Sequence, residues 1–134
     1  MQENVCLDTN IVAYYLNGDE RVIAEVGKSG VLYLPFIAAG ELLYGAKNST
    51  KVERNLKVYR LFLTKCSVLF ADGATSEIYS DIKIELKKGG KQIPVNDLWI
   101  AAIAKQNSLK LLTSDKHFTF INGLDLKYIE MYKV

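Results

Sequence analysis

Short apolar runs alternate along this chain with longer segments in which apolar residues recur every three or four positions. A short run that stops at turn residues is typical of a buried strand, and the longer periodic pattern is typical of an amphipathic helix. The first run ends abruptly at Asp8. Strands are expected at Val5–Leu7, Val31–Leu34, Val68–Phe70, Leu109–Thr113 and, at an edge of the sheet, Tyr128–Met131.

The segments between these runs carry helical patterns. Helices are expected at Ile11–Leu16, Asp19–Lys28, Pro35–Gly45, Lys51–Lys65, Asp72–Lys88 and Asn96–Ala104. The last of them is the most apolar and should be central, and Asn96 is expected to be its N-cap. This alternation predicts an α/β fold with a mostly parallel sheet of four to five strands and helices on both faces. Because no linker or repeat interrupts the pattern, residues 1–134 are expected to form a single domain.

Composition adds limits on stability and location. A chain of 134 residues with 49% hydrophobic residues can bury a core without disulfides or structural metal. Its formal net charge of +2 is too small to predict or exclude binding to nucleic acid. Cys6 and Cys66 lack partners at metal or redox spacing and are expected to be reduced core residues. No secretory signal or membrane-spanning run is visible, so a cytoplasmic protein is expected, with no membrane partner.

Four carboxylates occupy positions where a charge is costly. Asp8 and Asp115 follow apolar strands, Glu41 interrupts an apolar helix, and Asp97 stands in the first turn of the central helix. Each alone has a structural explanation, as a helix cap, an ion-pair residue, a dipole partner or a turn residue. The carboxyl ends of parallel strands meet at one edge of a sheet, however, and ligands bind there. We therefore expect the four side chains to converge in one crevice.

Four ionised carboxylates in one crevice repel one another unless cations neutralise them. Oxygen ligands favour Mg²⁺ or Mn²⁺, and such ions activate water for the hydrolysis of phosphodiester bonds. Cleavage through a cyclic phosphate needs two histidines that transfer protons, and this mechanism is excluded because the chain has a single histidine, His117. Short polar residues beside the acids are candidates for supporting hydrogen bonds, although each is also a plausible cap or turn residue; they are Thr9, Asn10, Asn96 and Ser114.

Two other functional classes fit parts of the pattern. A haloacid-dehalogenase-like phosphatase also uses an aspartate at a strand end, but it needs a second aspartate two residues later, where this chain has Asn10. A non-catalytic RNA-binding module would use the basic faces around Lys51–Arg60 and Lys83–Lys91. Four acidic residues in one crevice argue against a non-catalytic RNA-binding module, because without metal they would repel the phosphates of RNA.

Four segments, in this order along nearly the whole chain, resemble a PIN domain, and most of all the VapC-type ribonuclease toxins of prokaryotic toxin–antitoxin pairs. The segments are Leu7–Asn10, Gly40–Ala46, Ile93–Ala102 and Leu112–Phe118. The resemblance implies a PIN-like (Rossmann-like) α/β/α sandwich and a Mg²⁺- or Mn²⁺-dependent endoribonuclease. Its acidic quartet matches Asp8, Glu41, Asp97 and Asp115.

The same resemblance implies how the site works and what it meets. Asp8, Asp97 and Asp115 are expected to hold the metal, with Glu41 acting through a water molecule. Partners implied by the family are an RNA substrate, either tRNA or ribosomal RNA, and a cognate VapB-type antitoxin that blocks the active-site groove. A homodimer is implied as well.

Overall fold

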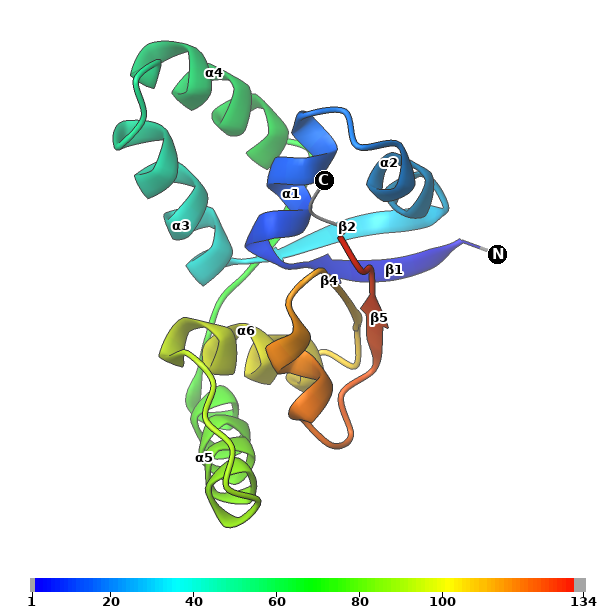
Figure 1. Ribbon diagram of the computed structural model, residues 1–134, viewed down its shortest axis with the longest axis vertical. Helices are drawn as coiled ribbons and strands as arrows, with labels where there is room; N and C mark the ends of the chain where they lie inside the picture. Colours follow the sequence, from blue (N-terminus) through cyan, green and yellow to red (C-terminus); the bar gives the residue numbers. More distant parts are fainter. Residues whose placement is uncertain (1, 132–134) are drawn as a thin grey trace.

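The computed structural model describes residues 2–131 and shows a parallel sheet between two layers of helices (Figure 1). The five strands of the described residues lie in the order β3-β2-β1-β4-β5, and every neighbouring pair is parallel. They are β1 (Glu3–Leu7), β2 (Ser29–Pro35), β3 (Ser67–Leu69), β4 (Lys110–Thr113) and β5 (Leu126–Tyr128). The strand that leads to Asp8 is therefore the central one, with paired neighbours on both sides.

Helices cover both faces of this sheet, as the alternating pattern predicted. They are α1 (Thr9–Leu16), α2 (Glu20–Gly27), α3 (Phe36–Lys47), α4 (Val52–Leu63), α5 (Gly73–Lys88), α6 (Val95–Gln106) and the 3-10 helix η1 (Lys116–Phe120). In Figure 1, α1 to α4 lie above the sheet, whereas α5, α6 and η1 lie below it. The α/β/α sandwich is thus confirmed, with the α3–α4 pair and α5 at opposite ends of the molecule.

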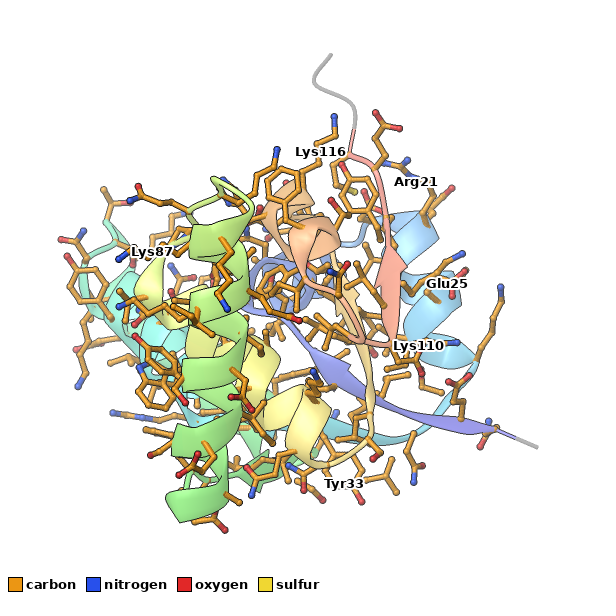
Figure 2. The ribbon with its side chains drawn as sticks, turned by 90° about the horizontal axis from the view of Figure 1, so that it is seen from below. Arg21, Glu25, Tyr33, Lys87, Lys110 and Lys116 are labelled. Carbon is orange, nitrogen blue, oxygen red and sulfur yellow. The ribbon has the colours of Figure 1, made fainter. Side chains whose placement is uncertain are left out.

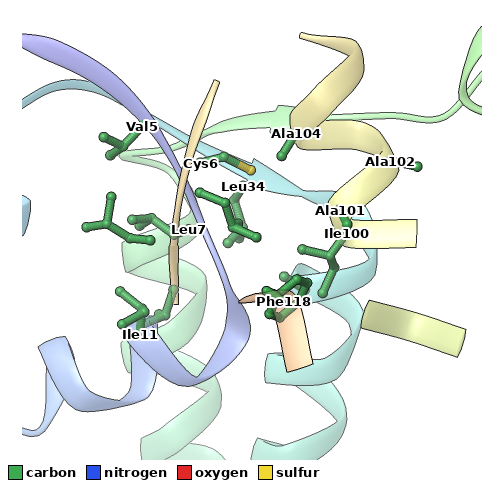
Figure 3. Packing of buried hydrophobic residues seen from close by; sticks show 14 of the residues in the cluster. Val5, Cys6, Leu7, Ile11, Leu34, Ile100, Ala101, Ala102, Ala104 and Phe118 are labelled. Atoms are coloured by element: carbon green, nitrogen blue, oxygen red, sulfur yellow. The ribbon is translucent and has the colours of Figure 1, made fainter. Parts of the chain in front are cut away.

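The core covers both faces of the central strands, and α6 packs against one of these faces (Figure 3). Every residue from Ile100 to Ala104 is fully buried, so the helix with the most apolar sequence is indeed central. Three of these five residues are alanines, whose short side chains let the backbone of α6 lie close to β2 and β4. Phe118 of η1 fills the space beside Ile100. This packing fixes the first turn of α6 relative to the carboxyl edge of the sheet.

The start of α6 differs from the expectation, because Asn96 is not its N-cap. Pro94 occupies that position in an extended conformation, and no side chain caps the helix. Proline suits a helix start because its φ angle is already fixed and its missing N–H is not needed there. Asn96 therefore becomes the second residue of α6, and its side chain is free to turn toward the acidic residues.

The last strand also lies earlier than expected, at Leu126–Tyr128 rather than Tyr128–Met131. Pairing with β4 explains the shift, since Thr113 at the end of β4 stands opposite Tyr128. The edge position of this strand is confirmed. Helix η1 was not predicted, because its five residues are too few to show a helical period.

The cysteines behave as small core residues. Both are free thiols. Cys6 is fully buried in β1, and burial raises its pKa far above the usual range. Cys66 is half-buried, and burial raises its pKa to about 11. Neither thiol is therefore a reactive thiolate at neutral pH. Among the residues described, none of the helices has the length and apolar character that crossing a membrane requires.

Candidate active site

The four acidic residues singled out in the sequence meet at the carboxyl edge of the sheet. Asp8 directly follows β1, and Asp115 follows the neighbouring strand β4 by two residues. Glu41 comes from the middle of α3, and Asp97 from the first turn of α6. Their charges act on one another: those of Asp115 and Glu41 raise the pKa of Asp8, and those of all three raise the pKa of Asp97. The structure therefore brings together four residues that are far apart in the sequence.

Asp8 is the most firmly held of the four, with only 3% of its surface exposed. Its Oδ1 accepts a hydrogen bond from the backbone N–H of Thr9 at 2.8 Å, which makes it the N-cap of α1. Its Oδ2 accepts one from the hydroxyl of Thr113, also at 2.8 Å. Burial raises the pKa of Asp8 to about 6 although both hydrogen bonds favour the charged form. Capping and a role in the site are therefore compatible for this residue.

Glu41 is linked to Asp8 through Thr9. The hydroxyl of Thr9 donates to Glu41 Oε1 at 2.7 Å, while the backbone N–H of the same residue holds Asp8. The amide of Asn96 approaches Glu41 Oε2 at 3.5 Å. Within the described part of the chain, no lysine or arginine forms an ion pair with Glu41. A structural ion pair therefore does not explain this charge inside an apolar helix.

Asp97 and Asp115 form the more open half of the site, together with His117. One ligand atom from each of these three side chains lies within 4.8 Å of the others. His117 donates its backbone N–H to Asp115 Oδ1 at 2.9 Å, and its Nδ1 lies 2.9 Å from the same oxygen. Burial first, and then the charges of Asp8 and Asp115, raise the pKa of Asp97 to about 7. This carboxyl is therefore partly protonated at neutral pH until a cation arrives.

Two residues of the site were not identified from the sequence. Thr113 is fully buried, donates its hydroxyl to Asp8 and accepts the backbone N–H of Asp115 at 2.9 Å, so it fixes two acids at once. A polar residue at the end of a buried strand was the available signal. His117 entered the sequence argument only as the single histidine, whereas its position two residues after Asp115 places it among the acids.

The four predicted supporting residues divide into two pairs. Thr9 and Asn96 contact Glu41, as described above. Asn10 is exposed on α1, and Ser114 lies between Thr113 and Asp115. Among the described residues, no side-chain hydrogen bond joins Asn10 or Ser114 to the acids. A supporting role for that second pair stays a prediction.

The residues present fit a divalent cation. Carboxylate oxygens are the ligands that Mg²⁺ and Mn²⁺ prefer. The raised pKa values of Asp8 and Asp97 have burial as their main cause and mutual repulsion as the second, and a bound cation relieves both. Asp97, Asp115 and His117 are placed to hold such an ion together, with Asp8 beside them. Direct ligation by Asp8, expected from the sequence, stays a prediction.

These shifts predict an unusual pH dependence of stability for the metal-free protein. Asp8 and Asp97 have folded pKa values of about 6 and about 7, above the ordinary value of 3.8. Between the ordinary pKa of 3.8 and these folded values, the folded state binds more protons than the unfolded state. The free energy of unfolding should therefore fall as pH rises from about 4 to about 7. Urea unfolding in a chelating buffer at several pH values measures this change in the free energy of unfolding. Saturating Mg²⁺ should flatten the curve, and stability that rises through this window would contradict the assignment.

Comparison with known proteins agrees with this geometry. The PIN domain family matches residues 5–123. Ribonuclease VapC2 of Haemophilus influenzae is 34% identical over 111 residues, which cover 81% of this chain and 84% of that protein. The tRNA(fMet)-specific endonuclease VapC of Shigella flexneri is 30% identical over 121 residues, covering 88% and 92%.

Solved structures give the same answer for the fold. VapBC2 of Rickettsia felis, bound to a DNA fragment from its promoter, contains a chain that superposes with a TM-score of 0.87 at 27% identity, covering 95% of this chain and 99% of that one. VapBC-1 of nontypeable Haemophilus influenzae gives a TM-score of 0.84 at 31% identity, with coverages of 93% and 97%. The resemblance seen in the sequence motifs is confirmed, and the chain belongs to the PIN domain family.

Proposed function

We propose that this protein is a divalent-metal-dependent endoribonuclease that hydrolyses RNA phosphodiester bonds and acts as the toxin of a toxin–antitoxin pair. The observation that carries the proposal is the meeting of Asp8, Glu41, Asp97 and Asp115 at one edge of the sheet. The family supports it, because relatives that match more than four-fifths of the chain are named ribonucleases. The family also favours cleavage of RNA over the two alternatives, a haloacid-dehalogenase-like phosphatase and a non-catalytic RNA-binding module.

The chain's own residues divide the work of binding and proton transfer. Asp97 and Asp115, with Asp8 beside them, would hold Mg²⁺ or Mn²⁺ through carboxylate oxygens, and His117 lies against Asp115. When bound, such an ion neutralises charge on the scissile phosphate and makes water a better nucleophile. Thr9 and Thr113 keep Asp8 oriented, so that its charge is in place before the substrate arrives. Glu41, held by Thr9 and half-buried, would accept a proton from the attacking water.

The substrate and location follow from the relatives. We infer that the RNA is a tRNA or a ribosomal RNA, since one relative is named as specific for tRNA(fMet). Both kinds of RNA are found in the cytoplasm, and that is where we expect the protein to act.

The solved relatives also suggest the partners. The structures from Rickettsia felis and Haemophilus influenzae are VapBC complexes. We infer that a VapB-type antitoxin covers the acidic crevice of this chain and blocks access of RNA. We also infer a homodimer, in which each copy of the domain carries its own set of four acids.

Cleavage of RNA by the purified protein tests the function. We expect cuts at a few defined positions in tRNA or ribosomal RNA with Mg²⁺ or Mn²⁺, and none after treatment with EDTA. Sequencing of RNA 5′ ends after brief induction in cells without the antitoxin would name the substrate. Protein that binds RNA tightly but leaves it intact with either metal would instead support the non-catalytic RNA-binding module.

A further inference from the structure

A basic pocket lies beside the acidic residues, between the end of α5, the loop at residues 89–94 and the start of α6. Its volume is about 720 Å³, within the roughly 300–1,000 Å³ usual for ligand-binding pockets. It is lined by three lysines, by Gln92 and by mostly apolar residues, and none of the described residues that line it is acidic. The lysines are Lys83, Lys87 and Lys91, and the apolar residues include Leu86, Ile93 and Val95.

Most charges on α5 are sorted onto two faces, the exception being Lys88, which follows Glu85 by three positions and lies on the acidic side. Lys83 and Lys87 are four residues apart and share one face of the helix. The acids of the same helix have the same four-residue spacing, offset by two positions, and so lie on the opposite face; they are Glu77, Asp81 and Glu85. Like charges at this spacing destabilise a helix. The helix dipole stabilises Lys87 in the last turn, and a lysine face without interspersed acids leaves its charges available to an external anion.

Aromatic rings hold two of the lysines over the surface. Lys91 Nζ lies 4.7 Å from the ring centre of Phe120, and Lys83 Nζ lies 5.6 Å from that of Tyr79. The ring of Tyr79 stacks in turn on Trp99 at 3.9 Å. In the described part of the chain, none of the three pocket lysines forms an ion pair with an acidic side chain. Their charges are positioned but not neutralised by the protein.

The pocket and the acidic site both take residues from the first turn of α6. Val95 and Leu98, which line it, stand on either side of Asp97 in the first turn of α6. Phe120, beneath Lys91, belongs to η1, the helix that begins directly after Asp115. In Figure 2, the end of α5 with Lys87 and the start of η1 with Lys116 both lie toward the upper side of the view. The start of α6 therefore carries residues of both the pocket and the acidic site, and η1 connects Asp115 to the ring beneath Lys91.

We propose that this pocket binds the single-stranded segment of the RNA substrate next to the scissile bond. The lysine ammonium groups bind backbone phosphates, and the apolar lining contacts a base or ribose. The inference rests on the proposed function and names where its substrate is held. Such a site is needed because the acidic crevice repels phosphates before metal binds, and the net charge of +2 supplies little general attraction.

Removal of two pocket charges tests the proposal. In Lys87→Gln/Lys91→Gln we expect the KM for RNA cleavage to rise about tenfold, and the slope of log KM against log salt concentration to fall by about 1.4, because two phosphate contacts are lost. The matched control is Lys47→Gln/Lys65→Gln, which changes the net charge equally at the ends of α3 and α4, outside the pocket. Lys47 is in the last turn of α3 as Lys87 is in that of α5, and Lys65 follows α4 as Lys91 follows α5.

The possible results of this experiment distinguish failure of the pocket proposal from failure of the proposed ribonuclease function. Lys87→Arg/Lys91→Arg keeps the charges, so its salt slope should match that of wild type and its KM should rise much less than that of the glutamine pair, which distinguishes loss of charge from loss of fold. Wild-type protein that does not cut RNA overturns the proposed function and this inference with it. Wild-type protein that cuts RNA, with equal KM for both glutamine pairs, overturns this inference alone. Weakened antitoxin binding with an unchanged KM would make the pocket a protein-docking surface and would also overturn it.

Discussion

Asp97→Asn should lower RNA cleavage at least about a thousandfold while the protein stays folded. Loss of one metal-directed charge removes several kcal/mol of transition-state stabilisation, and about 4 kcal/mol corresponds to that factor. Stability should be retained, because Asp97 lies beside Asp115 and an asparagine amide can donate a hydrogen bond to that carboxylate. The first turn of α6 is unaffected, since Asp97 is not its N-cap. Single-turnover cleavage and thermal unfolding measure the two effects.

Asp81→Asn is the matched control for this substitution. It makes the same chemical change on a helix, but at an exposed position of α5. We expect cleavage within about twofold of wild type for this variant, as surface substitutions away from a site have small effects. If Asp97→Asn cuts RNA normally but unfolds at a much lower temperature, then Asp97 serves the helix and has no part in the chemistry.

The architecture was readable from the sequence because it depends on patterns that few other structures satisfy. Five apolar runs separated by helical segments leave little choice except a parallel sheet covered on both faces. The convergence of Asp8 and Asp115 followed from the same logic, since both end apolar strands and the carboxyl ends of parallel strands meet at one edge. The hydrophobic pattern determines the sheet topology, and the topology in turn places Asp8 and Asp115 next to each other.

What the sequence did not reveal depends on contacts between distant segments. Thr113 looked like the last residue of a strand, and only the pairing of β1 with β4 shows that its hydroxyl reaches Asp8. Asn96 was expected to cap α6, because asparagine is preferred at helix N-caps, but Pro94 occupies the N-cap position. The side-chain amide of Asn96 points toward Glu41 instead. The end of β5 was set by its register against β4. In each case a tertiary neighbour decided what local preference left open.

Glu41→Gln should lower cleavage about a hundredfold or more and, in metal-free buffer, raise the melting temperature by about 2–4 °C. Activity falls because a neutral amide cannot accept a proton from water. Stability rises because the charge of Glu41 disfavours ionisation of Asp8 and Asp97, and glutamine removes that repulsion. The hydrogen bond from Thr9 survives, since the amide oxygen of glutamine accepts it as Oε1 does.

The gain in stability should depend on metal, and that dependence distinguishes a site residue from a structural one. With saturating Mg²⁺ the wild type is stabilised by the bound ion, and the advantage of Glu41→Gln should shrink or reverse. Glu77→Gln, the same change at an exposed position of α5, should leave the melting temperature within about 1 °C of wild type with or without metal. A Glu41→Gln protein that melts lower in both buffers and still cuts RNA would show that Glu41 supports the fold instead. A higher melting temperature without metal, together with lost cleavage, is the result that mutual repulsion among the four acids requires.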